Sequence, residues 1–186
     1  AKLGAKKSYL IDINEELIGT YRTLAEDVEG VIEVLRPHIY DKEYYYQIRA
    51  QDPAALTPAQ RAARMIYLNR SGFNGLYRVN KSGFFNVPFG RYSNPVICDD
   101  KNLRAVSHAL KRAKLFCGPF TQVLERAEAD DLAYFDPPYV PLSHSSSFVS
   151  YARDGFDAED QLALVETARK LTQNGVYTLL SNSDTP

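Results

Sequence analysis

Apolar and polar positions alternate along this chain in a way that predicts short strands separated by helices. Four apolar runs are typical of buried strands: residues 9–13, 115–117, 132–135 and 176–180. Apolar residues at helical spacing predict three helices around these runs: residues 14–28, 99–113 and 157–174. Because strands that alternate with helices are typical of parallel sheets, we expect an α/β protein with a doubly wound sheet.

Each of these helices begins at a residue type that commonly caps helices. Asn14 is the expected cap of the first helix, Asp99 or Asp100 of the second, and Asp157 of the third. The stripes expected to face the core are Leu17, Ile18, Tyr21, Leu24, Ala25 and Val28, then Leu103, Val106, Leu110 and Ala113, and finally Leu162, Val165, Ala168 and Leu171.

The middle of the chain does not follow the strand–helix alternation. Residues 57–60 (TPAQ) form a capping-box pattern with proline at the first helical position, which predicts a helix to about Asn69. Residues 69–92 then mix glycine, asparagine, aromatic and basic residues, and Lys81-Ser82-Gly83 could form the turn of a β-ribbon. We therefore expect a helical and β-hairpin subdomain at 51–98, inserted between two parts of one core domain, 1–50 and 99–186.

Charge is unevenly distributed along the 186 residues, although the net charge is only −1. Residues 53–124 hold eleven Lys/Arg and two Asp/Glu, a net charge of +9, whereas 1–52 carry −3 and 125–186 carry −7. A solvated surface normally mixes both signs, so this segregation favours a segment that binds a polyanion. Seven aromatic residues between Tyr67 and Tyr92 would suit nucleic-acid bases, although some should form a small core.

Composition excludes several other classes of protein. The chain has no apolar run of transmembrane length and no secretory signal, and its two cysteines have no CxxC spacing that would indicate zinc. We therefore expect no membrane partner, no bound metal and a cytoplasmic location.

The candidate chemistry lies at Asp136-Pro137-Pro138-Tyr139, directly after the run at 132–135. Ligands bind at the carboxyl ends of parallel strands, and here a carboxylate, a backbone carbonyl and an aromatic ring would share that edge. Two acceptors can hydrogen-bond both N–H groups of an exocyclic amine and free its delocalised lone pair, while the ring stacks on the base. The alternative interpretation is a proline turn that ends a strand.

Asp12 lies near the carboxyl end of the first apolar run, residues 9–13, much as Asp136 follows the run at 132–135. An acidic residue at the end of a strand in a nucleotide-binding sheet accepts hydrogen bonds from a ribose, so Asp12 is a candidate cofactor residue. The alternative is that Asp12 only caps the helix that follows.

Four motifs together resemble Dam-type DNA adenine-N6 methyltransferases of the D12 class. They are DPPY at 136–139, NRSGFNGLYR at 69–78, FNVPFGRY at 85–92 and Ser181-Asn182. The resemblance implies a Rossmann-like methyltransferase sheet and an S-adenosylmethionine-dependent enzyme without a metal. It also implies that adenine is flipped out of double-stranded DNA within GATC.

Roles carry over from the family residue by residue. The resemblance implies that Asp136, Pro137 and Tyr139 hold the flipped adenine, and that Asp12, Ile13, Phe120 and Asp136 bind the cofactor. It also implies that Arg78 reads a guanine, that Phe73 intercalates, and that bases are contacted by Leu76, Pro88 and Tyr92. Phosphate contacts are implied at Asn74, Asn80, Asn86 and Arg91.

The family's glycine loop, an aromatic-x-Gly-x-Gly turn after its first strand, is absent from this chain. We therefore expect a fragment that lacks this loop, a lysine that reads the first guanine, and further strands after Pro186. Two alternatives stay open: a non-catalytic DNA-binding module, and an amino methyltransferase for another base. We expect a monomer associated with the nucleoid of a bacterial or phage-infected cell, where DNA replication, repair and restriction–modification are all possible roles.

Overall fold

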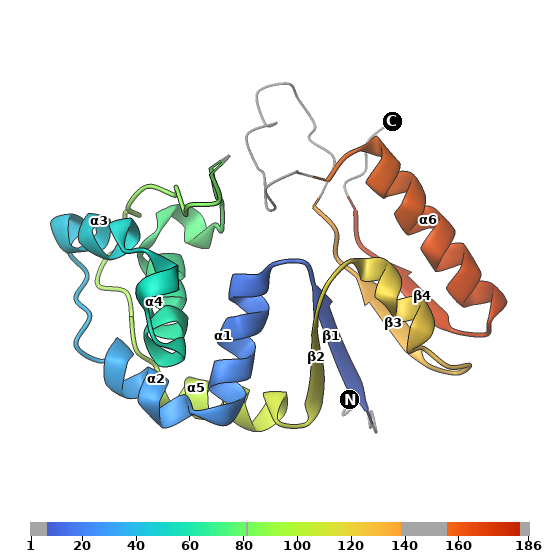
Figure 1. Cartoon of the computed structure of the whole chain (residues 1–186), viewed down its shortest axis with the longest axis horizontal. Helices are drawn as coiled ribbons and strands as arrows, with labels where there is room; N and C mark the ends of the chain where they lie inside the picture. Colours follow the sequence, from blue (N-terminus) through green and yellow to red (C-terminus); the bar gives the residue numbers. More distant parts are fainter. Residues whose placement is uncertain (1–6, 81, 139–155, 183–186) are drawn as a thin grey trace. The chain divides into compact units, whose positions relative to one another are not determined.

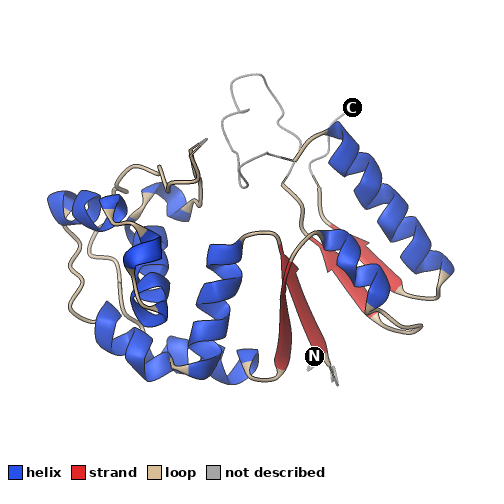
Figure 2. Cartoon of the chain, viewed as in Figure 1, coloured by secondary structure: helices blue, strands red, loops and turns tan. Residues whose placement is uncertain are grey.

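The computed structural model describes residues 7–80, 82–138 and 156–182. Two compact units make up the chain (Figure 1). The first comprises the described residues of Ala1–Tyr77 and Phe85–Cys117, and the second those of Arg78–Phe84 and Gly118–Pro186. Figure 2 shows helices and paired strands in both units, so the protein combines helix and strand as the alternation predicted.

The first unit contains a parallel pair of strands, β1 (Ser8–Asp12) and β2 (Ala113–Cys117), in which Asp12 lies opposite Cys117. Helix α1 (Glu15–Glu26) follows β1 directly. Its cap is Asn14, as expected, since the Asn14 side chain accepts a hydrogen bond of 3.1 Å from the backbone N–H of Leu17. Both strands therefore lie where the apolar runs predicted them, to within about two residues.

Helix α1 is shorter than its apolar stripe predicted. The Asp27 side chain accepts from the N–H of Gly30 and caps a new helix, α2 (Val28–Leu35), so Val28 belongs to α2. The expected helix at 99–113 is shortened as well. It is observed as α5 (Asp100–Leu110), capped by Asp99, and Ala113 begins β2 instead of facing the core from the helix.

Helices build most of the first unit's core. Helix α3 (Lys42–Ala50), the 3-10 turn η1 (Pro53–Ala55) and helix α4 (Pro58–Ser71) precede the 3-10 turn η2 (Phe73–Gly75). The capping box of α4 is confirmed, and α4 packs against α1, α2 and α3. The core of the first unit consists of Leu24, Val31, Ile32, Leu35, Tyr45, Ile48, Ala62, Ala63, Tyr67, Leu68, Phe85, Val87, Leu103 and Leu110. Phe85 and Val87 confirm that part of the aromatic-rich segment is core.

The segment 72–92, here called the recognition hairpin, turns back on itself with little regular strand. Gly72 and Phe89 form an isolated antiparallel bridge, flanked by hydrogen bonds from Phe73 N–H to the Pro88 carbonyl (2.9 Å) and from Gly90 N–H to the Ser71 carbonyl (2.8 Å). The described residues between η2 and α5 thus form bridges where a β-ribbon was expected, and Lys81 of the expected turn lies outside the described residues.

The second unit contains the 3-10 helix η3 (Phe120–Glu125), strand β3 (Leu132–Phe135), helix α6 (Ala158–Gln173) and strand β4 (Tyr177–Leu180). Strands β3 and β4 are parallel, with Phe135 opposite Leu180. Asp157 caps α6 as expected, and Gly175 ends it with φ of +78°. Residues 141–148, whose lack of periodicity predicts a flap, lie outside the described residues.

The predicted inner face of α6 was partly wrong. Leu162 is 71% exposed and Val165 is 51% exposed in the described structure, whereas Leu164, Thr167 and Leu171 are buried. The buried cluster of this unit consists of Ala133, Phe135, Leu164, Leu171 and Val176. Helix α6 packs against η3 and β4 and therefore buries the face that meets them. This face is rotated about the helix axis from the stripe that the apolar periodicity predicts.

Candidate active site and nucleic-acid interface

Asp136 is held at the carboxyl end of β3 by the residue that follows the neighbouring strand. Ser181 directly follows β4, and its backbone N–H donates to the Phe135 carbonyl at 3.0 Å. The Ser181 hydroxyl donates to the Asp136 carboxylate at 2.6 Å. A hydrogen bond of this length to a carboxylate is among the stronger types in proteins. The carboxylate is therefore oriented by a side chain 45 positions away in the sequence.

The described residues of this motif differ in their exposure. Asp136 is exposed, and Pro137 and Pro138 are half-buried. The Tyr134 hydroxyl lies 3.4 Å from that of Ser181, so it supports the serine side chain. Tyr139, the expected stacking residue, lies outside the described residues. The described part of the motif thus offers a fixed acceptor at the edge where parallel strands bind ligands.

Asp12 lies at the equivalent end of β1, where the chain turns into α1. One of its carboxylate oxygens accepts from the backbone N–H of Asn14 at 2.7 Å, so Asp12 does stabilise the start of the helix. Next to it, the Ile13 side chain is 59% exposed. The amide nitrogen of the Asn14 side chain is buried and has no hydrogen-bond partner among the described residues.

These three residues fit an adenosine group. A carboxylate accepts from ribose hydroxyls, an exposed aliphatic side chain covers a purine ring, and a buried amide donor without a partner suits an acceptor atom of a ligand. Phe120, the other expected cofactor contact, begins η3 in the second unit and packs against Phe156 with ring centroids 6.1 Å apart. Asp12 and Ile13 belong to the first unit, whereas Phe120 and Asp136 belong to the second.

Several expected DNA contacts protrude from the recognition hairpin. Phe73 is 44% exposed, Leu76 is 40% exposed, and Pro88 and Arg91 are exposed. Asn74 is exposed in the left-handed region with φ of 53°, a conformation that asparagine tolerates better than most residues. Arg78 and Asn86 are half-buried. The described hairpin therefore turns apolar, amide and basic side chains outward, over a backbone tied to the core.

Two of the expected contacts have structural duties as well. The Asn80 side-chain oxygen accepts from the N–H groups of Ser82 and Phe84, each at 3.0 Å, and so shapes the hairpin turn. The Tyr92 hydroxyl donates to the Gly72 carbonyl at 3.0 Å, which holds its ring against the hairpin. Sequence patterns did not indicate either bond, because both depend on the turn geometry.

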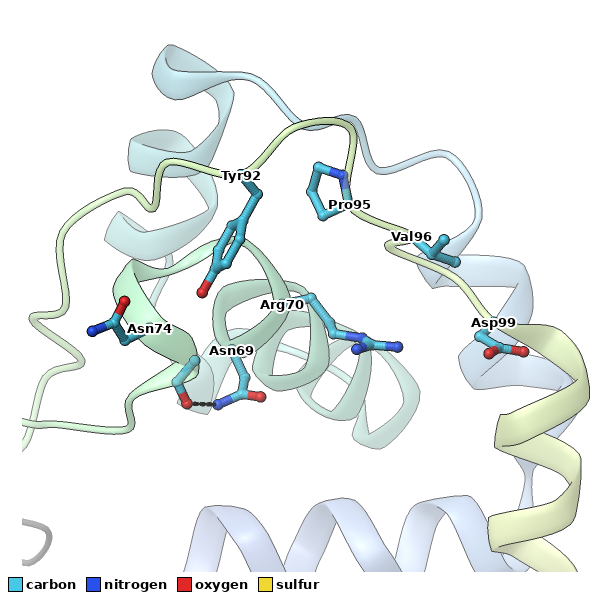
Figure 3. Close-up of a pocket in the computed structure, with 8 residues that line it drawn as sticks. Asn69, Arg70, Asn74, Tyr92, Pro95, Val96 and Asp99 are labelled. Carbon is cyan, nitrogen blue, oxygen red and sulfur yellow. Dashed lines mark hydrogen bonds between the residues drawn. The ribbon is translucent and has the colours of Figure 1, made fainter.

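An open hollow beside the hairpin brings two expected contacts together with a residue that sequence reasoning missed. Its volume is about 700 Å³, and its walls are Asn69, Arg70, Asn74, Gly75, Tyr92, Pro95, Val96 and Asp99 (Figure 3). The Asn69 side chain donates to the Gly75 carbonyl and closes one side. Arg70 lies in the last turn of α4 and points along the hollow. The sequence signal that could have identified Arg70 was its position as a basic residue shortly before Gly72 and Phe73.

The structure also narrows the set of cations that the positive middle segment offers. The Arg64 side chain is 2% exposed and paired with Glu16, and Arg104 is bound to Glu29 at 2.6 Å. Their charges are therefore compensated within the protein. Near the hairpin, the described basic residues Arg70, Arg78 and Arg91 are candidates for contacts with DNA.

Within the described ranges, no group of three or more His, Cys, Asp or Glu side chains is placed to hold a metal ion. The same ranges contain no helix that is both long and apolar enough to cross a membrane.

Comparison with known proteins adds the family. A family model for D12 class N6 adenine-specific DNA methyltransferases matches residues 1–186. The chain is 41% identical over 193 residues to the type II methyltransferase M1.LlaDCHI of Lactococcus lactis subsp. cremoris, which covers 100% of this chain and 68% of the relative. It is 43% identical over 190 residues to the type II methyltransferase M.MjaIII of Methanocaldococcus jannaschii, with 96% of this chain and 66% of the relative covered. It is 39% identical over 181 residues to a DNA adenine methylase of Vibrio cholerae, with 95% and 65% covered. The chain spans about two thirds of the length of these relatives. It belongs to the D12 class N6 adenine-specific DNA methyltransferases, a family of enzymes, as its motifs predicted.

Proposed function

We propose that this chain forms the adenine-binding, DNA-reading part of a methyltransferase that modifies the N6 amine of an adenine flipped out of duplex DNA, within GATC. The observation that carries the proposal is the Asp136 carboxylate, fixed by the Ser181 hydroxyl at 2.6 Å at the carboxyl end of β3. Family membership supports adenine as the target, and the hairpin motif, through its resemblance, supports GATC.

The Asp136 carboxylate and the Pro137 carbonyl act on the amine by accepting its two hydrogen bonds. The nitrogen lone pair is otherwise delocalised into the purine, and two acceptors draw the nitrogen toward tetrahedral geometry. These bonds strengthen as positive charge develops on nitrogen, so they stabilise the transition state more than the bound base. Tyr139 stacks on the flipped base.

S-adenosylmethionine supplies the methyl group when it is bound. Asp12 would accept from the ribose hydroxyls of its adenosine part, and the family resemblance adds Ile13, Phe120 and Asp136 as further cofactor contacts. The fit of Asp12, Ile13 and the Asn14 amide to an adenosine supports this assignment.

We further propose that residues 1–50 and 99–186 form one doubly wound, Rossmann-like sheet with its helices, and that 51–98 is an inserted recognition subdomain.

The recognition hairpin reads and holds double-stranded DNA. Arg78 donates two hydrogen bonds to a guanine, and Phe73 inserts between bases. Because the Asn80 oxygen is occupied by the turn, its amide nitrogen is the atom that would face a phosphate. The remaining contacts are Leu76, Pro88 and Tyr92 on bases, and Asn74, Asn86 and Arg91 on phosphates, with Arg70 added from the hollow. We expect a monomer that acts on the bacterial nucleoid.

The test measures methyl transfer and duplex binding on the same preparation of each variant. Asp136→Ala should lower methyl transfer by on the order of 100-fold or more, as loss of a preorganised transition-state contact does, while duplex affinity stays within about twofold. Asp136→Asn keeps one acceptor and should retain part of the activity. Glu125→Gln, at a carboxylate that is 72% exposed in the same unit, is the control and should change neither quantity.

Two outcomes would contradict the proposal. Equal loss of transfer and of duplex binding in Asp136→Ala would show that this carboxylate does not act on the amine. Binding without any transfer by the unaltered protein would favour the non-catalytic DNA-binding module.

A further inference from the structure

Tyr77 ties the first arm of the recognition hairpin to helix α1. Its hydroxyl donates to one carboxylate oxygen of Glu16, in the first turn of α1, at 3.0 Å. Its ring packs edge-on against Phe85 with centroids 5.6 Å apart. The two contacts hold opposite ends of the side chain, so Tyr77 fixes the first arm of the hairpin at the point where it leaves the core.

The Glu16 carboxylate is itself held in place by a buried cation. Its second oxygen accepts from the Arg64 guanidinium at 3.1 Å. The Arg64 side chain also donates to the backbone carbonyls of Ile48, at 3.1 Å, and Arg49, at 2.9 Å, near the end of α3. Burial lowers the pKa of Arg64, and Glu16 opposes this shift, so the pair stabilises the charged state in a mostly buried setting. Residues of α1, α3 and α4 thus hold the Glu16 carboxylate in place as the acceptor for the Tyr77 hydroxyl.

The position of Tyr77 in the chain gives this anchor a consequence for DNA reading. Tyr77 lies between Leu76 and Arg78, two of the residues proposed to contact bases. Along an extended segment, neighbouring side chains point to opposite sides, so an inward Tyr77 directs Leu76 outward and fixes the backbone from which the Arg78 side chain extends. Leu76 is 40% exposed, in agreement with this alternation, whereas Arg78 is half-buried.

We propose that Tyr77, held by Glu16 and Arg64, is a positioning residue that determines how well the hairpin discriminates between base pairs. The inference rests on the proposed function, because it acts through Arg78. Two parallel hydrogen bonds to a guanine need a defined approach of the guanidinium, whereas a phosphate accepts a cation from many directions. Loss of the anchor therefore affects base discrimination more than overall affinity.

The test uses Tyr77→Phe, which removes only the hydroxyl. Dissociation constants are measured for the GATC duplex and for duplexes substituted at each position of the site, well below the melting temperature of every variant. At the base pair where Arg78→Ala relaxes the preference, Tyr77→Phe should reduce the discrimination ratio by about 3- to 10-fold. Its salt dependence on non-specific DNA should stay unchanged, since no phosphate contact is removed.

Tyr67→Phe is the matched control. The Tyr67 hydroxyl donates to the Ile39 carbonyl at 2.9 Å in the same unit, so this variant also loses a hydroxyl hydrogen bond, in this case to a residue outside the hairpin. It should keep the discrimination of the unaltered protein. Glu16→Gln should keep it as well, because the amide oxygen can accept from Arg64 and the amide nitrogen can donate to the Tyr77 oxygen.

A double variant separates this inference from the proposed function. In an Arg78→Ala background, Tyr77→Phe should cause no further loss at the base pair that Arg78 reads. If Arg78→Ala relaxes that position and Tyr77→Phe does not, the positioning role is wrong while the reading role of Arg78 stands. If Arg78→Ala relaxes no position, the proposed reading and the positioning inference both fail.

Discussion

Replacement of Glu16 by alanine tests whether burial, rather than contact distance, determines the strength of an ion pair in this protein. Glu16 and Arg64 are 3.1 Å apart, with side-chain exposures of 17% and 2%. Glu29 and Arg104 are closer, at 2.6 Å, but are 64% and 47% exposed. A ranking by distance would make the second pair the stronger one. A ranking by burial makes the first pair the one that matters for stability.

The expected cost follows from the charge that Glu16→Ala leaves behind. Removal of one partner from a buried pair destabilises proteins by about 3–5 kcal/mol, because the remaining charge is uncompensated. Arg64 keeps its hydrogen bonds to the Ile48 and Arg49 carbonyls, so we expect the lower end of that range. The loss is still large against the 5–15 kcal/mol or so that stabilises a typical domain.

The assay is urea unfolding followed by far-ultraviolet circular dichroism, with Glu29→Ala as the control. Glu16→Ala should shift the midpoint clearly, whereas Glu29→Ala should leave it within error. In Glu16→Ala/Arg64→Met both charges are gone but the two α3 carbonyls lose their donor, at about 1–3 kcal/mol each, so stability should not return fully. Equal and small losses in Glu16→Ala and Glu29→Ala would refute the reasoning.

Three further predictions concern the proposed site. Ser181→Ala removes the donor to Asp136 and should lower kcat about tenfold, equal to about 1.4 kcal/mol, with the same cofactor KM; single-turnover rates check this, and an unchanged rate would mean that the serine does not orient the carboxylate. Asp12→Ala should weaken S-adenosylmethionine binding by about 1–3 kcal/mol in isothermal titration while duplex affinity hardly moves; unchanged cofactor binding would leave Asp12 as a helix-stabilising residue alone. Arg91→Ala should weaken all duplexes alike and reduce the slope of log affinity against log salt by about one, whereas Arg78→Ala relaxes one base pair; identical losses for both arginines on every duplex would make the hairpin a phosphate clamp.

Features that depend on a few neighbouring residues could be predicted from the sequence. The caps at Asn14 and Asp157 and the capping box of α4 each involve atoms within three positions of one another. The four strands were predicted because their apolar runs are short and bounded by polar residues. Local chemistry is sufficient for such features, since the sequence itself brings the partners together.

Features that depend on tertiary contacts could not be predicted in this way. Leu162 and Val165 match the helical period, yet α6 buries another face because η3 and β4 lie there. Asp27 divides one long apolar stripe into two helices through its bond to Gly30. Counting charges placed Arg64 among the polyanion-binding cations, because its partner Glu16 lies 48 positions away. The same limit hid the contact between Ser181 and Asp136, which spans 45 positions.

The recognition hairpin combines a fixed backbone with exposed side chains, and this combination would favour the specific reading proposed for it. The Val87 carbonyl accepts from the Tyr45 hydroxyl at 2.9 Å and from Arg49 at 3.0 Å. The Tyr40 hydroxyl donates to the Gly90 carbonyl and accepts from the N–H of Tyr92, at 2.9 and 2.7 Å. Hydrogen bonds to side chains of α3 and of the loop before it thus order the second arm in the absence of DNA. Ordering in advance lowers the entropy cost of binding, and it also restricts the directions in which exposed side chains can approach a base, so mismatched bases are not accommodated by a shift of the backbone.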